Sequence, residues 1–174
     1  YTGPSASSPV KRGVAIRERL LCQDLPPPPP GVDAELPPPD PNISTRERFA
    51  WHTSEPLCAA CHRLIDGLGF TLEGYDALGQ LRATDGGTAV RVDGTFVSIH
   101  DGHVTDLAGP YDLAAEIAAS QDAARCLVQR YMRFLAGRAR KELPDPNAMS
   151  CWIESVVYAM QNTSQPLREM ILSI

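Results

Sequence analysis

The sequence predicts a mainly α-helical protein with a small β-hairpin insertion and a C-terminal helical region. Hydrophobic residues recur at helical spacing near the N-terminus and throughout the last third of the chain. Turn signals rich in glycine and aspartate replace that pattern between residues 81 and 104. The 174 residues are 43% hydrophobic, which suffices for one compact domain with an appended lobe.

The first predicted helix begins at Pro9, after a flexible tail over residues 1–8, and ends near Cys22. Its apolar face is expected to hold Val10, Val14 and Leu21, with three arginines left in solvent: Arg12, Arg17 and Arg19. A proline-rich segment over residues 26–41 follows. Because prolines donate no backbone hydrogen bond, this segment should adopt polyproline II, either as a strap along the folded surface or as a free hinge.

A second, short helix is predicted through about His52. Ser44 and Glu47 form a capping box at its start, and Pro56 lies beyond its end. Between residues 81 and 104, the DGG triplet (85–87) and the DG pair (93–94) indicate the turns of a small hairpin.

Four further helices are expected over residues 111–119, 122–136, 147–161 and 166–173, with Gly137 as a C-terminal stop. Two apolar stripes should enter the core: Leu127, Tyr131 and Leu135 on one helix, and Ile153, Val156, Val157 and Met160 on the next. Residues 9–105 are therefore predicted to form one domain, on which the helical region 106–174 packs.

Charge and hydropathy exclude two classes of partner. The formal net charge of −5 argues against nucleic acid, because phosphate binding requires clustered lysine and arginine. No apolar run approaches the roughly 18 to 20 residues of a membrane-spanning helix.

The chemistry of the chain is concentrated in Cys58-Ala59-Ala60-Cys61-His62, which has the spacing of a c-type haem attachment site. Two thiols at this spacing can form thioethers with the two vinyl groups of one haem, and the histidine that follows is then the proximal iron ligand. A thioredoxin-type dithiol needs a strand-to-helix setting. A structural zinc site needs a second pair of ligands, whereas the other three cysteines are isolated in the sequence.

Three segments, 12–30, 45–82 and 126–138, give the chain a resemblance to a known family. They resemble the C-terminal cytochrome-c-like region of large multidomain secreted proteins that are common in planctomycetes and myxobacteria, and the likeness extends from about Pro9 onward. The resemblance implies one covalent haem c at Cys58, Cys61 and His62 in an extracytoplasmic protein. Residues 9–105 are then the haem domain.

The chain departs from the family pattern after the motif. The pattern has Ile-Asp-Pro, whereas Gly67 follows Asp66 here. In many c-type cytochromes a nearby proline carbonyl accepts a hydrogen bond from the proximal histidine. A backbone carbonyl near Gly67 is expected to take that role, less rigidly.

The sixth iron ligand determines what a haem at this site does, because methionine, histidine and an open position favour different chemistry. His52 is the first candidate, with packing at the haem edge or a hydrogen bond to a propionate as the alternative. Met132 is the second candidate, although methionine in such a helix is commonly a core residue. His100 and His103 are weaker candidates, since histidines in a turn are commonly exposed.

An extracytoplasmic location permits disulfides. Cys126 and Cys151 lie on two neighbouring predicted helices, and we expect them to pair. Cys22 is then left over, although its pairing with either of the other two stays open.

The sequence thus predicts a monohaem c-type cytochrome that transfers electrons to a redox partner protein or to upstream domains of the same polypeptide, and that is not an enzyme. One alternative is a peroxidase-like or oxidase haem enzyme with an open sixth position, in which His52 with Arg46 or Arg48 supplies a polar distal pocket. Another is an interaction module that haem holds together.

Overall fold

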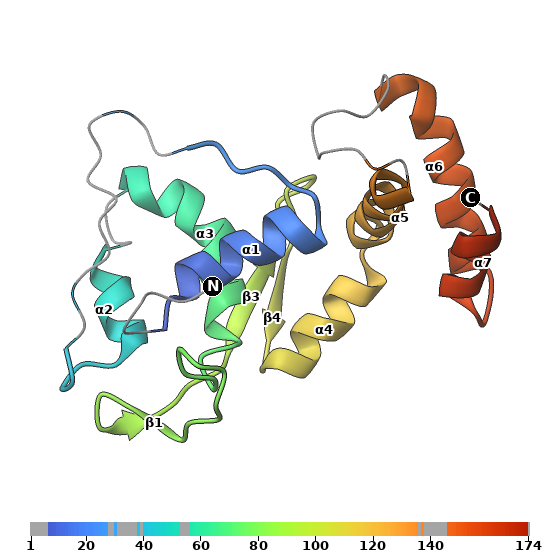
Figure 1. The fold of residues 1–174 in the computed structure, drawn as a ribbon. Helices are drawn as coiled ribbons and strands as arrows, with labels where there is room; N and C mark the ends of the chain where they lie inside the picture. The colour runs from blue at the N-terminus through green and yellow to red at the C-terminus, as the bar shows by residue number, and fades with distance from the viewer. Residues whose placement is uncertain are drawn as a thin grey trace. The chain divides into compact units, whose positions relative to one another are not determined.

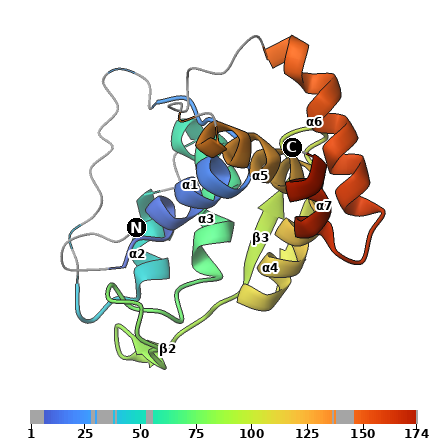
Figure 2. The same ribbon diagram turned by 45° about the vertical axis from the view of Figure 1, so that its right-hand side comes forward.

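The computed structural model describes residues 7–27, 30, 38, 40–52, 56–135, 137 and 146–173. The fold is mainly helical with two small antiparallel hairpins, as predicted (Figures 1 and 2). The chain divides into two compact units. The first contains the described residues up to Glu18 and Gln23–Glu116, and the second contains Arg19–Cys22 and the chain from Ile117 onward.

The first unit contains α1 (Pro9–Leu20, which continues into the second unit), α2 (Thr45–His52) and α3 (Pro56–Phe70). The capping box forms at the start of α2: the Ser44 amide donates to the Glu47 carboxylate at 3.0 Å, and the Glu47 amide donates to Ser44 Oγ at 3.3 Å. These two bonds satisfy donors that a helix N-terminus leaves unpaired. The Ser44 hydroxyl also donates to the Glu47 carboxylate at 2.6 Å, and this bond, followed by the bond from the Ser44 amide, holds the pKa of Glu47 below its ordinary value.

Helices α1 and α3 lie side by side with their backbones in direct contact (Figures 1 and 2). A Cβ atom added to Gly13 would overlap the backbone of Ile65, and one added to Gly69 would overlap the backbone of Pro9. Glycine is therefore required at both positions for this helix pair.

Two of the arginines predicted to be solvated on α1 are buried instead. Arg17 is fully buried and donates to the carbonyls of Leu64 (2.8 Å) and Val97 (2.5 Å), while its guanidinium lies 4.9 Å from the centre of the Phe96 ring. Arg12 donates to the Glu73 carboxylate at 2.9 Å. The prediction was wrong because a guanidinium can enter an interior that offers it carbonyl and carboxylate acceptors.

Ser7 and Ser8, which the sequence assigned to the flexible tail, are also buried. The Ser7 hydroxyl donates to both oxygens of Glu73, at 2.5 and 2.7 Å. Arg82 donates to the same carboxylate at 2.6 Å, so Glu73 connects the N-terminal segment to the loop after α3.

The insertion forms two hairpins. Strands β1 (Thr84–Asp85) and β2 (Thr88–Ala89) flank the predicted DGG turn. Strands β3 (Gly94–Val97) and β4 (Val104–Leu107) pair with Gly94 opposite Leu107 and Val97 opposite Val104. The DG pair predicted as a turn is instead the entry to β3, because α3 packs on this strand and the chain turns later, at residues 98–103.

The second unit contains α5 (Gln121–Leu135), α6 (Pro146–Gln161) and α7 (Pro166–Ser173), and α4 (Pro110–Ala119) leads into it. These helices match the prediction to within one residue, and Gly137 has a left-handed φ of 61° just after α5. In α6 the predicted stripe is confirmed, since it packs with Val128 and Met170 in one apolar core. In α5 the prediction is confirmed only for Tyr131, which packs against this core; Leu127 and Leu135 are exposed, and Val128 and Cys126 are buried instead.

The disulfide joins Cys22 to Cys126, not Cys126 to Cys151. Cys151 is an exposed free thiol. It stands two residues before Ile153, and therefore about 200° around α6 from the stripe that faces the core. That position explains why the expected pair does not form, and Cys22, the open alternative, takes its place.

Candidate functional site

The Cys58–His62 motif occupies the first two turns of α3, a helix that the sequence analysis did not predict. Pro56 is the first residue of α3, where its missing N–H group costs no helical hydrogen bond. Cys58 is half-buried, Cys61 is exposed, and neither is in a disulfide. Both thiols and the histidine therefore project from the N-terminal end of one helix.

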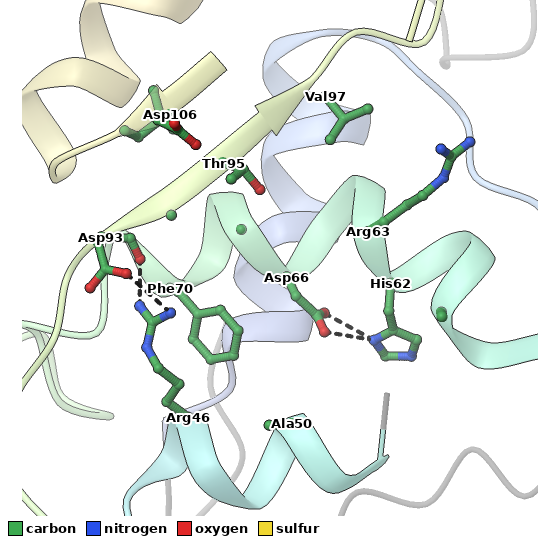
Figure 3. A pocket seen from close by; sticks show the side chains of 14 residues that line it. Arg46, Ala50, His62, Arg63, Asp66, Phe70, Asp93, Thr95, Val97 and Asp106 are labelled. Atoms are coloured by element: carbon green, nitrogen blue, oxygen red, sulfur yellow. Dashed lines mark hydrogen bonds and ion pairs between the residues drawn. The ribbon is translucent and has the colours of Figure 1, made fainter. Parts of the chain in front are cut away.

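His62 is fixed by a carboxylate four residues further along α3. Its Nδ1 atom lies 2.9 and 3.1 Å from the two oxygens of Asp66 (Figure 3). Both side chains are largely buried, with 16% of His62 and 11% of Asp66 exposed. A carboxylate accepts hydrogen bonds, so Nδ1 is the donor in this pair, and Nε2 is the other ring nitrogen through which a histidine can bind a metal.

This arrangement differs from the expectation that a backbone carbonyl near Gly67 would hold the histidine. Asp66 holds the ring instead, and α3 continues through Gly67 to Phe70. Glycine is needed at position 67 for another reason: a Cβ there would overlap the backbone and hydroxyl of Thr95 on β3. Glycine at position 67 thus allows α3 and β3 to lie in close contact.

A cleft of about 710 Å³ lies beside His62, within the range of small-molecule and cofactor pockets. It is bounded by α2, α3 and the β3–β4 hairpin, and Figure 3 shows Asp66 and His62 on the side of α3 that faces α2. Its apolar lining consists of Ala50, Ala59, Phe70, Val97 and Leu107. Its charged lining consists of Arg46, Arg63, Asp66, Asp93 and Asp106.

Arg46 presents a cation with an unused hydrogen-bond donor to this cleft. Its guanidinium lies 4.3 Å from the centre of the Phe70 ring and donates to the Asp93 carbonyl (Figure 3). The Nε atom is buried and lacks a hydrogen-bond partner within the described residues. Burial, by removing water from the guanidinium, lowers the pKa of Arg46, with a smaller opposing effect from Asp93. An anionic ligand in the cleft would supply the missing acceptor.

The other candidate ligands lie in several places. His52 is the last residue of α2, and its side chain lies outside the described part of the chain. Met132 packs against the apolar core of the second unit, as a core methionine does. His100 and His103 are exposed in the turn between β3 and β4. The sixth-ligand assignment stays a prediction.

The fit of a zinc site is poorer. In the parts of the chain that the structure describes, there is no group of three or more histidine, cysteine and acidic side chains that could hold a metal ion. The described residues do fit a haem, because the cleft combines an oriented imidazole, an apolar lining and a cation for acidic side groups.

Sequence reasoning missed Asp66 and the contribution of the hairpin. Asp66 could have been found, since a residue four positions after His62 shares its helix face once the motif is placed on a helix. Thr95, Val97 and Leu107 reach the cleft through pairing of distant segments, for which the sequence has no local signal.

Comparison with known proteins identifies one matching family model. Residues 1–85 match PSCyt3, described as a protein of unknown function (DUF1588). The family name points to a cytochrome-like domain. The match spans α1 to α3, including Cys58, Cys61 and His62, and covers two of the three segments on which the resemblance rests. No curated protein and no solved structure matches the chain.

Among the helices that the structure describes, none combines the length and apolarity needed to cross a membrane.

Proposed function

We propose that the first unit binds one haem c and that the protein carries single electrons outside the cytoplasm. The observation that supports this function best is the geometry of α3. Both thiols and His62 occupy its first two turns, and the His62 ring lines a cleft with Nδ1 held by Asp66. Haem bound there supplies an iron centre that cycles between two oxidation states.

The chain's own residues attach and orient the group. Cys58 and Cys61 would each hold the haem through one thioether, formed when the thiol adds across a vinyl group with its hydrogen going to the other vinyl carbon, so no oxidant would be needed. Both cysteines are free, as this addition requires. His62 would bind the iron through Nε2. Arg46 and Arg63 line the same cleft and can pair with the propionates, while the apolar lining excludes water.

The disulfide between Cys22 and Cys126 supports an extracytoplasmic location, because cytosolic reductants keep most thiols reduced. The electron partner is a redox protein or another domain of the same polypeptide.

Haem attachment can be tested by producing the chain in a periplasm that matures c-type cytochromes. We expect haem to remain on the denatured polypeptide, with a pyridine haemochrome spectrum typical of two thioethers. Cys58→Ala and Cys61→Ala should each give a spectrum of one thioether, and the double variant should lose covalent haem. Cys151→Ala, which removes the free thiol outside the motif, is the matched control. Wild-type protein without covalent haem would refute the proposal.

A haem enzyme is a second candidate, favoured by Arg46. A partly desolvated cation with an unused donor beside an open iron position can assist cleavage of a bound peroxide. Carbon monoxide and hydrogen peroxide separate the two functions. We expect the reduced spectrum to remain unchanged under carbon monoxide and peroxide turnover to be negligible. A carbon monoxide complex together with turnover that Arg46→Gln abolishes would favour the enzyme instead.

A further inference from the structure

We infer that Asp66 is a positioning residue that sets the reduction potential of iron bound to His62. This inference rests on the proposed function, since it concerns an iron ligand. Its basis is the pair of contacts at 2.9 and 3.1 Å between the Asp66 carboxylate and His62 Nδ1. A carboxylate behind a ligating histidine fixes the ring and raises its electron donation to the metal.

The location of the pair strengthens this effect. Only 11% of the Asp66 side chain is exposed, so water competes little for its oxygens. Charge-assisted hydrogen bonds are roughly twice as strong as neutral ones, and a low local dielectric increases the difference. A neutral backbone carbonyl in this place would donate less electron density to the ring. Asp66 therefore favours ferric over ferrous iron and lowers the potential.

The helix makes the pair rigid. His62 and Asp66 are separated by four residues on α3, the spacing at which helical side chains meet. Next to them, Gly67 packs directly against the Thr95 backbone, which prevents the helix from shifting relative to β3. The ring plane of His62 is thus set by two elements of the fold, not by the bound group.

Spectroelectrochemical titration of the haem-loaded full chain tests the inference with Asp66→Asn, Asp66→Glu and Asp106→Asn. Asp106→Asn is the matched control, because Asp106 is an exposed carboxylate of the same cleft. It removes the same charge without touching His62. For Asp66→Asn we expect about a tenfold loss of the preference for ferric iron, a rise of ~59 mV for a one-electron couple. Asp106→Asn should shift the potential much less.

Asp66→Glu separates geometry from charge, since it keeps the carboxylate but moves it by one methylene. Its potential should rise above that of wild type, by less than the rise in Asp66→Asn. If Asp66→Asn fails to fold or to retain haem, the potential of Asp66→Glu alone tests whether Asp66 sets the reduction potential.

Two results overturn the inference while leaving haem binding intact: equal shifts of the potential in Asp66→Asn and Asp106→Asn, or a potential in Asp66→Glu that matches wild type. Absence of covalent haem from wild-type protein is a different failure, because it refutes the proposed function itself.

Discussion

The two units of this chain are stabilised by different interactions. The second unit has an apolar core around Val128 and Val156, closed by the disulfide from Cys22 to Cys126. The first unit instead buries Arg17, Arg12 and Glu73, brings its helix backbones together at glycines, and leaves a large cleft. These buried polar contacts and the backbone contacts add to the apolar residues that the first unit buries, among them Phe49 and Leu68.

The disulfide provides the largest expected effect, and it acts on the second unit. Replacing Cys22 and Cys126 together by serine should lower the free energy of unfolding by about 4 kcal/mol, the size expected when a crosslink across roughly 100 residues is lost. Urea denaturation followed by circular dichroism measures it. Cys151→Ser should have little effect, and an equal loss in that variant would show that Cys151 is the bonded cysteine after all.

Arg17→Met tests the polar anchoring of the first unit. The substitution leaves the carbonyls of Leu64 and Val97 without this donor inside the protein, at a cost of about 3 kcal/mol. Lys11→Met, an exposed change on the same helix, is the control and should be nearly neutral. A similarly small effect of both variants on the free energy of unfolding, measured by urea denaturation, would mean that the buried guanidinium contributes little to stability. The two units would then differ less in what stabilises them.

Gly67→Ala tests the backbone contact between α3 and β3. The added Cβ overlaps Thr95, so the two elements must separate, at a cost of about 2 kcal/mol. Because Gly67 adjoins Asp66, we also expect the haem-loaded protein to lose haem spectral intensity at a lower temperature. Gly74→Ala is the control, since its Cβ would meet only the end of the Val92 side chain, at 3.3 Å. Equal melting temperatures for the two variants would contradict the requirement for glycine.

The two units also differ in how well the sequence predicts them, because one has an apolar core and the other buries polar side chains. The helices of the second unit and its stripe from Ile153 to Met160 could be predicted from apolar periodicity, because apolar residues at helical spacing lie on the helix face that packs in an apolar core. The capping box at Ser44 and the Cys58–His62 motif could also be recognised, because each lies within a few consecutive residues. Periodicity failed for Arg17, since a charged residue on an apolar face gives no sign of the acceptors that distant segments bring to it. It also failed for Cys22, whose partner depends on which face of α5 is buried.

The smallest expected effect is the pH dependence of the capping box in the first unit. Hydrogen bonds from Ser44 lower the pKa of Glu47, so the ionised carboxylate is stabilised in the folded state. Its contribution is complete above the pKa of an unfolded glutamate and is lost as the pH falls through the lower, folded value. Glu47→Gln should therefore melt slightly below wild type at pH 7, and the gap should close as the pH is lowered below the ordinary pKa of glutamate. A gap that stays constant over this range would show that the charge on Glu47 does not stabilise α2, and that the amide caps the helix equally well.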